Sequence, residues 1–209
     1  MAYIFCIANQ KGGVGKTTTA VNTAAALAKK RKKVLLVDLD AQGNATTGSG
    51  IEKSECELTI YDLLVDPDVK FEDVVRRCEV GGYDVIPSNR ELSAAELEIA
   101  ELEDRDNLLK NSLAKVADRY DFILIDCPPS LSLITVNALC CAMGVIVPMQ
   151  CEYYAMEGLS DLVATINRVV ANKNPDLKVI GVLRVMYSPR ISLQNLVSNE
   201  LMETFGAVV

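Results

Sequence analysis

The sequence lacks histidine altogether. Nucleophilic catalysis by a Ser-His-Asp or Cys-His arrangement is therefore excluded, and any chemistry must rest on carboxylates, lysines, hydroxyls, backbone amides or a metal ion. The seven cysteines include no C-x-x-C pair, which disfavours both a zinc site and a disulfide framework. Most of them stand in apolar surroundings, so we expect them to be buried as small hydrophobic side chains.

Long hydrophobic runs are also absent. No apolar stretch reaches the roughly 18 to 20 residues that span a bilayer, and the start MAYIFCIANQ lacks the basic region and cleavage site of a secretory signal. We therefore expect a cytoplasmic protein without a membrane segment. The 209 residues are 50% hydrophobic and contain no repeat or Pro/Gly-rich linker, which predicts one domain over 1–209.

Charge is distributed unevenly along the chain. The formal net charge is -7, yet residues 1–37 contain seven Lys or Arg and no acidic residue. Five of these form the run KKRKK (29–33), which is either a nucleic-acid patch or, as we favour, a solvated helix end whose cations complement the helix dipole. The acidic residues of the segment 50–106 are expected to form a solvated helix face; they include Glu96, Glu98, Glu101 and Glu103.

The order of patterns along the chain is strand, loop and helix, repeated. The strand-like runs are continuously apolar, as in parallel strands that are covered on both faces. They predict an α/β fold with a doubly wound, mostly parallel sheet and helices on both faces, in three α/β/α layers. The expected strands are 3–8, 33–40, 83–88, 121–128, 144–149 and 177–186, and the expected helices are 17–31, 59–65, 92–118, 131–142, 155–172 and 191–204.

A glycine-rich loop directly follows the first strand and directly precedes the first helix, in the text ANQKGGVGKTTTA (8–20). Such a loop directs backbone N–H groups at one spot, at the positive end of a helix, and predicts an anion site. Lys16 can reach β- and γ-phosphates, the Thr17 hydroxyl can ligate Mg²⁺, and Thr18 can contact an α-phosphate. The cofactor-binding residues expected here are Gly12, Gly13, Val14, Gly15, Lys16, Thr17 and Thr18.

Carboxylates stand at the ends of two later strands, at the edge where open α/β sheets bind ligands. VLLVDLD ends on Asp38 and Asp40, and FILID ends on Asp126. An apolar run that closes on Asp126 is the expected form of a Walker B strand, whose carboxylate holds Mg²⁺ directly or through water. Asp38 lies on the same strand as Asp40, with its side chain differently directed.

The loop departs from the generic G-x-x-x-x-G-K-[ST] pattern, because Gln10 replaces the first glycine and Lys11 stands inside the loop. The text K-G-G-x-G-K-T resembles the deviant Walker A motif of the ParA/MinD class of P-loop ATPases. VLLVDLDAQGNAT resembles switch I of the ParA/Soj partition ATPases, with Ala41 in place of the usual proline. IDCPPSLSLITVNAL and VPMQCEYYAMEGL resemble later parts of the same family, and the similarity covers the chain from Tyr3 to about Phe205.

This resemblance implies a Mg²⁺-dependent ATPase that is slow without a stimulating partner. Asp40 would orient the attacking water, Lys16 would act on the bound phosphates, and Lys11 would reach the phosphates of the other subunit in an ATP-bound homodimer. The family binds DNA nonspecifically in the ATP state, associates with the nucleoid, and is stimulated by a ParB-type protein. Arg190 matches a family position implicated in DNA contact, although an exposed arginine at a helix start would look the same.

Two alternatives remain open. A MinD-like ATPase that is recruited to the membrane shares the loop, but would require a C-terminal amphipathic helix. A metabolic P-loop enzyme, such as a dethiobiotin synthetase-like ligase, shares the fold but fits the K-G-G and D-L-D-A-Q-G-N texts poorly. The chain ends at LMETFGAVV, where a helical pattern passes into a strand-like one, so we expect it to lack the family's C-terminal strand and helices.

Overall fold

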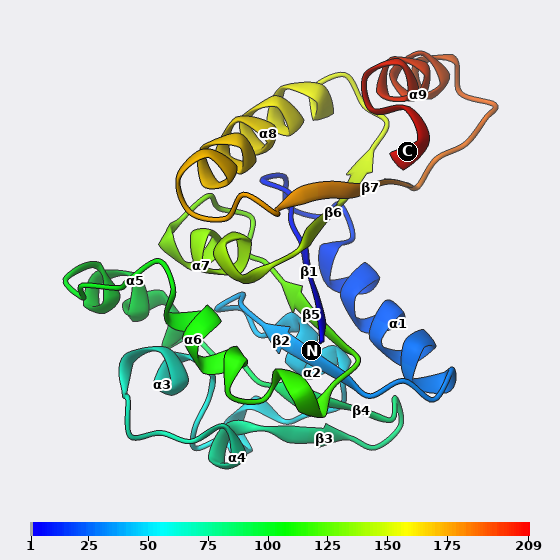
Figure 1. Cartoon of the computed structure of the whole chain (residues 1–209). Helices are drawn as coiled ribbons and strands as arrows, with labels where there is room; N and C mark the ends of the chain where they lie inside the picture. Colours follow the sequence, from blue (N-terminus) through cyan, green and yellow to red (C-terminus); the bar gives the residue numbers. More distant parts are fainter. Residues whose placement is uncertain (1) are drawn as a thin grey trace.

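A single seven-stranded sheet forms the centre of the computed structural model, which describes residues 2–209 with the exception of the side chain of residue 157 (Figure 1). The strand order is β3-β4-β2-β5-β1-β6-β7, and every neighbouring pair is parallel apart from β3 and β4. The predicted doubly wound, mostly parallel sheet is thereby confirmed. The strands are β1 (Tyr3–Ile7), β2 (Val34–Asp38), β3 (Arg76–Cys78), β4 (Tyr83–Ile86), β5 (Phe122–Asp126), β6 (Gly144–Gln150) and β7 (Lys178–Val185).

Helices cover both faces of this sheet. Figure 1 shows α1 on one side and α3, α5, α6, α7 and α8 on the other. The longer helices are α1 (Lys16–Lys29), α3 (Ile60–Val65), α5 (Leu92–Ala100), α6 (Leu108–Ala114), α7 (Leu133–Cys141), α8 (Ala155–Asn172) and α9 (Ser192–Phe205); α2 (Asn44–Gly48), α4 (Phe71–Val74) and three 3-10 turns (Lys53–Glu55, Ala117–Arg119 and Gly206–Val208) complete the described elements.

The strand β2 explains how continuous apolar text builds two cores. Val34 and Leu36 pack with the small residues of α1, whereas Leu35 and Val37 pack on the opposite face, with the helices of that side. Successive side chains of a strand point to opposite faces of the sheet, so in a strand that is covered on both faces every position is buried and apolar. This burial fixes the carboxyl end of β2, where the predicted site begins.

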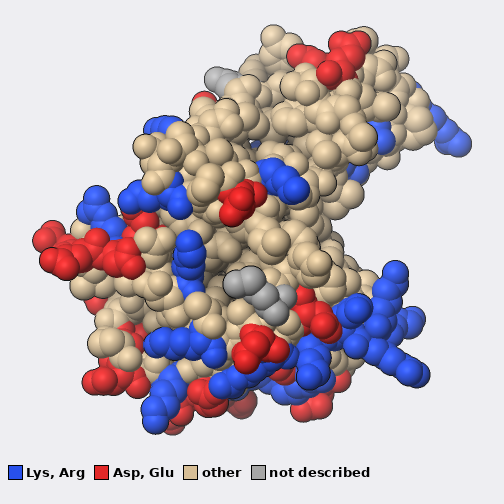
Figure 2. Space-filling view, in the orientation of Figure 1, with Lys and Arg blue, Asp and Glu red and all other residues tan. Residues whose placement is uncertain are grey.

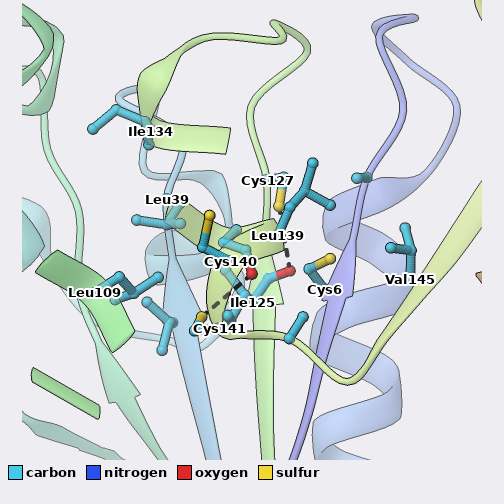
Figure 3. Close-up of a cluster of buried hydrophobic side chains, with 14 of the residues drawn as sticks. Cys6, Leu39, Leu109, Ile125, Cys127, Ile134, Leu139, Cys140, Cys141 and Val145 are labelled. Atoms are coloured by element: carbon cyan, nitrogen blue, oxygen red, sulfur yellow. Dashed lines mark hydrogen bonds between the residues drawn. The ribbon is translucent and has the colours of Figure 1, made fainter. Parts of the chain in front are cut away.

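All seven cysteines are buried and free, which confirms their expected role as small apolar side chains. Figure 3 shows Cys6, Cys127, Cys140 and Cys141 among the hydrophobic residues beneath the carboxyl edge of the sheet. No group of three or more His, Cys, Asp or Glu residues that could hold a metal ion occurs in the described part of the chain.

The helix predicted over 92–118 is wrong as one element. It is divided into α5 and α6 by an acidic turn, in which Asp104 accepts hydrogen bonds from the side-chain amides of Asn107 (2.7 Å) and Asn111 (2.9 Å). Short polar side chains that bond nearby groups compete with the helical backbone, and here the turn prevails. The sequence prediction also missed α2, α4 and β3, which are five, four and three residues long.

The charged segments agree with expectation except at one position. Residues 29–33 are exposed at and beyond the end of α1, and Figure 2 shows basic side chains gathered at that end of the molecule. Glu98, Glu101 and Glu103 are exposed as expected. Glu96 is the exception, because its Oε1 atom is buried without a hydrogen-bond partner in the described structure.

Candidate active site

The loop between β1 and α1 has the backbone that an anion site requires. Gly13 and Gly15 have positive φ angles of 73° and 80°, a region that residues with a side chain rarely adopt. Gly15 is the N-cap of α1, so the first N–H groups of the helix open toward the loop without a capping side chain. The positive end of the helix dipole is therefore directed at the space in front of the loop.

Asn9 fixes the start of this loop against the neighbouring strand. Its side-chain amide donates to the carbonyl oxygen of Pro148 at 2.8 Å, and its Oδ1 accepts from the backbone N–H of Lys11 at 2.9 Å. The side chain is 5% exposed, so both bonds are shielded from water. The loop is consequently anchored to the carboxyl end of β6 as well as to its own strand.

Lys16 is the first residue of α1 and is only 7% exposed. Its ammonium group donates to the carbonyl oxygen of Lys11 at 3.1 Å, across the loop. Burial lowers the pKa of Lys16, and the nearby carboxylates of Asp126 and Asp40 oppose this effect. A largely desolvated cation that makes one hydrogen bond to a neutral group is well suited to an anionic ligand.

Asp126 ends β5, which lies between β1 and β2, so that its Cα is paired with Ile7 on one side and Asp38 on the other. Burial raises the pKa of Asp126 to about 7, while the Thr17 hydroxyl and the Lys16 ammonium oppose the shift. Neither carboxylate oxygen has a hydrogen-bond partner of ordinary geometry in the described structure. Orphaned carboxylate oxygens beside a threonine hydroxyl are hard ligands of the kind that Mg²⁺ prefers, so these residues fit that ion.

One cavity of about 320 Å³ collects most of the predicted site residues. Asp126 does not line it, but is buried close to Lys16. Val14, which is 1% exposed, does not line this cavity but a neighbouring one of about 360 Å³. The cavity is lined by Gly12, Gly13, Gly15, Lys16, Thr17, Thr18, Asp40, Gln42, Asn44, Pro129 and Met186.

Four of these lining residues received no role from sequence reasoning. Gln42 and Asn44 belong to the stretch that resembles switch I, and this resemblance could have indicated them. Pro129 belongs to the stretch that follows Asp126. Met186 follows β7 with a positive φ of 51°, and no pattern in the sequence indicated it.

The two aspartates of β2 and its following loop have different surroundings. Asp38 accepts hydrogen bonds from the backbone N–H and the hydroxyl of Thr46, both at 2.7 Å, which ties the strand to α2. Burial raises the pKa of Asp38 to about 6, and these bonds oppose the shift. Asp40 is partly exposed, accepts from the N–H of Gln42 at 2.9 Å and lines the cavity. The expected difference in side-chain direction is thus observed.

Lys11 is separated from the cavity that Lys16 lines. Its ammonium group is 2.5 Å from Oε2 of Glu152, in the segment after β6. Lys11 lines a second cavity of about 360 Å³, together with Tyr154 and Asp161. Arg190 is exposed in the turn between β7 and α9 and belongs to neither cavity. The structure therefore brings together Asp40 and most of the residues that are predicted to bind phosphate, and leaves the side chains of Lys11 and Arg190 apart from them.

A glycine loop that opens a helix, a lysine and a threonine at its end, and a buried carboxylate on the adjacent parallel strand define a P-loop nucleotide protein. A family model described as an AAA domain matches residues 2–179. Named relatives identify the family more closely: at 49% identity to a Soj protein and 46% identity to a ParA protein, the chain belongs to the ParA/Soj family of partition ATPases.

The relatives that carry this assignment match nearly the whole chain. The sporulation initiation inhibitor protein Soj of Bacillus subtilis is 49% identical over 205 residues, which cover 98% of this chain and 81% of Soj. The chromosome partitioning protein ParA of Myxococcus xanthus is 46% identical over 198 residues, which cover 95% of this chain and 70% of that protein. The family predicted from the loop and switch texts is confirmed.

Solved structures agree with the fold and with the kind of ligand. Cobyrinic acid a,c-diamide synthase from Mycobacterium smegmatis, with bound ADP and magnesium, has a TM-score of 0.92 and 37% identity, and the match covers 98% of this chain and 83% of that one. A plasmid partition protein from Borrelia burgdorferi, bound to AMPPNP, has a TM-score of 0.81 and 30% identity, with 97% and 83% covered. No helix among the described residues is long and apolar enough to cross a membrane.

Proposed function

We propose that this chain is a Mg²⁺-dependent ATPase that dimerises with ATP, binds DNA nonspecifically in that state, and segregates chromosomes or plasmids together with a ParB-type partner. The observation that carries the proposal is the proximity of Lys16 and the buried carboxylate of Asp126 at the start of α1. Lys16 lines the cavity and donates to the carbonyl oxygen of Lys11, and both oxygens of the nearby Asp126 are buried without a hydrogen-bond partner in the described structure. A nucleoside triphosphate with Mg²⁺ would supply an anionic partner for the ammonium group of Lys16 and a cation for the carboxylate of Asp126.

The residues of the cavity divide the work of phosphoryl transfer. The N–H groups of Gly12, Gly13 and Gly15 and the ammonium group of Lys16 would bind the phosphates, while Thr17 and Asp126 would hold Mg²⁺, directly or through water. When bound by these residues, Mg²⁺ would neutralise part of the negative charge of the phosphates. Asp40 lines the same cavity, where it would orient the attacking water.

Lys11 is proposed to act on the other subunit of an ATP dimer. Its ammonium group is turned from its own phosphate cavity and paired with Glu152 at the surface. An exposed ion pair of this kind is weak, about 0.2–1 kcal/mol, so it can exchange for a phosphate of the neighbouring subunit. Hydrolysis would remove that phosphate and loosen the dimer.

DNA binding is proposed to rest on phosphate contacts, to which the exposed Arg190 contributes. The protein would then be cytoplasmic and associated with the nucleoid in its ATP state. Sedimentation of the purified chain with plasmid DNA, and separately with liposomes, tests this assignment when each is done with and without ATP. ATP-dependent sedimentation with DNA alone is expected. Sedimentation with liposomes would instead favour the MinD-like alternative, and sedimentation with neither would favour a metabolic enzyme of this fold.

A further inference from the structure

A cavity of about 490 Å³ lies at the amino edge of the sheet, opposite the edge that carries the phosphate site. The first residue of β2, the strands β3 and β4, the helix α4 and the segment before β5 contribute to its walls. Figure 1 shows α4, β3, β4 and the end of α1 together at the lower end of the view. The five residues of β2 extend roughly 16 Å between this cavity and the loop that carries Asp40, so a small ligand here would not touch the phosphate site.

The cavity is lined by more cations than carboxylates. Figure 2 shows Lys and Arg side chains along this end of the molecule, with acidic side chains between them. The charged lining residues are four basic ones, Lys32, Lys33, Arg77 and Arg119, and two acidic ones, Glu72 and Asp84. The lining therefore has a formal excess of positive charge, which favours an anionic ligand.

Two of these cations are already paired with the two carboxylates. Nη1 of Arg77 lies 2.7 Å from Oδ1 of Asp84, and the other oxygen of Asp84 accepts from the hydroxyl of Tyr120 at 2.9 Å. Arg119 is paired with Glu72. These pairs hold the arginines in place and occupy both acidic residues of the lining.

The remaining cations of the lining are Lys32 and Lys33, which follow α1. Both are exposed, and neither forms an ion pair among the described residues. Asp121, which does not line the cavity, accepts from the backbone N–H of Lys33 at 2.8 Å rather than from its ammonium group. The structure thus divides the basic run 29–33, because Lys32 and Lys33 line this cavity whereas residues 29–31 do not. An anion bound here would meet both ammonium groups.

The size and walls of the cavity indicate which anion fits. Its volume falls in the range of roughly 300–1,000 Å³ that is typical of small-molecule sites, and a concave site suits a small ligand better than the convex surface of a nucleic-acid duplex. The buried side chains of Val34 and Phe71 add apolar surface to the walls. Lysine ammonium groups bind phosphate as point charges, and linked phosphates concentrate more negative charge and acceptor oxygens than carboxylates do.

We propose that this cavity is a second anion site, which binds a small ligand with two linked phosphate groups. Lys32 and Lys33 supply the charge that no carboxylate of the lining compensates. Arg77 and Arg119 retain further donors, because a guanidinium has five N–H groups and each recorded pair uses Nη1. The site does not depend on the ATPase function proposed above, since it shares no lining residue with the phosphate cavity.

Inorganic pyrophosphate is the probe, added without Mg²⁺ to the nucleotide-free protein and followed by two-dimensional amide NMR. We expect saturable shifts at Lys33, Gly82 and Tyr120, which line the cavity, in the millimolar range. Pyrophosphate bound by the glycine loop would shift Gly13 and Gly15 instead, so the two sites are followed separately. Malonate, a dicarboxylate, should bind the cavity at least about threefold more weakly, because it has fewer charges and acceptor oxygens.

Lys32→Gln combined with Lys33→Gln should weaken pyrophosphate binding at the cavity by about fivefold or more, because two ammonium–phosphate contacts are lost. Lys29→Gln combined with Lys30→Gln is the matched control, since it removes two exposed charges of the same run that do not line the cavity. At physiological ionic strength, where the Debye length is about 8 Å, the control should change the affinity by less than about twofold. All four side chains are exposed, so neither variant should unfold the chain.

Shifts at the glycine loop alone, or no saturable shift at all, would overturn the second site. Equal weakening by the control variant would mean a diffuse effect of charge and would also overturn it, as would equally tight binding of malonate. A short DNA duplex is the last probe, and shifts at Lys33, Gly82 and Tyr120 with the duplex but not with pyrophosphate would assign this surface to nucleic acid instead. A chain that shows the expected shifts but never hydrolyses ATP would refute the proposed function and still support the second site.

Discussion

The ammonium group of Lys11 lies 2.5 Å from Oε2 of Glu152, although both side chains remain partly exposed. The pair holds the loop lysine outside the cavity that Lys16 lines. If Lys11 serves a neighbouring subunit, as proposed, it must first leave this partner, and the pair would then oppose dimerisation slightly. Its strength is limited by solvent, and exposed pairs contribute about 0.2–1 kcal/mol.

Glu152→Gln should therefore favour the ATP dimer. Loss of the charge frees Lys11, and we expect the dimer dissociation constant in ATP to fall by a factor of about 1.4 to 5. Sedimentation velocity at several protein concentrations measures it. Glu103→Gln, an exposed acid elsewhere, serves as the control and should change nothing. Weaker dimerisation of Glu152→Gln would mean that Glu152 supports the dimer rather than restraining Lys11.

Lys16→Ala should abolish the binding of Mg²⁺-ATP. The change removes the main positive charge from the phosphate cavity, which the loop N–H groups alone cannot replace. Titration of a fluorescent ATP analogue measures the effect. The assignment of Lys16 fails if the analogue binds the variant as tightly as the unaltered chain.

Asp38→Ala and Asp40→Ala should separate stability from turnover. Asp38→Ala leaves the buried N–H and hydroxyl donors of Thr46 unsatisfied, which should lower the free energy of unfolding by roughly 1–3 kcal/mol in urea titrations. Asp40→Ala should unfold like the unaltered chain, keep ATP bound and stop hydrolysis, so that gel filtration with ATP shows a persistent dimer. A monomeric Asp40→Ala with normal hydrolysis would contradict the role given to Asp40.

DNA binding should require ATP and decrease steeply with salt. Each phosphate contact adds roughly 0.9 to the slope of log affinity against log salt concentration. Arg190→Ala should reduce that slope by about one contact and leave nucleotide affinity unchanged, as measured by fluorescence anisotropy of a labelled duplex. Lys178→Ala, an exposed cation at the start of β7, is the control. An affinity that depends on the DNA sequence, or that does not change with salt concentration, would contradict binding through phosphate contacts.

Much of the fold and of the site could be predicted, because the strands and the residues at their ends are indicated by local patterns in the sequence. Continuous apolar runs gave the parallel strands, and the residues at their carboxyl ends meet at one edge of the sheet, which places Asp126 beneath the loop. The position of Asp126 thus followed from topology. That both of its oxygens lack partners could not be read from the text, because hydrogen bonding depends on groups from other elements.

What the sequence failed to predict depends on contacts between distant segments. Lys11 and Glu152 are 141 positions apart, and no periodicity links them. Glu96 was expected in solvent from its acidic neighbours, but its Oε1 atom is buried in the described structure. The burial of a single side-chain atom depends on tertiary packing, which the local pattern does not indicate. The break between α5 and α6 was missed because the bonds of Asp104 compete with a helical pattern that is otherwise continuous.

The last prediction decides whether Lys11 acts in its own subunit or in its neighbour. Lys11→Ala alone and Asp40→Ala alone should each be nearly inactive. Lys11→Ala lacks the positive charge that would contact the transferred phosphate. This contribution is comparable in kind to that of an arginine finger, which is worth about 10³ to 10⁵ in rate. Asp40→Ala lacks the group that orients water. In a mixed dimer of these two variants, the two models give opposite results.

If Lys11 crosses the interface, the site on the Lys11→Ala subunit retains its own Lys16 and Asp40 and receives Lys11 from the Asp40→Ala partner, so one complete site is restored. If Lys11 acts within its own subunit, both sites remain defective. Mixing the two purified variants with ATP should therefore restore hydrolysis, with a bell-shaped dependence on the mixing ratio. A mixture no more active than the sum of its components, under conditions where heterodimers are shown to form, would assign Lys11 to its own subunit. The pair with Glu152 would then hold Lys11 away from its own phosphate cavity.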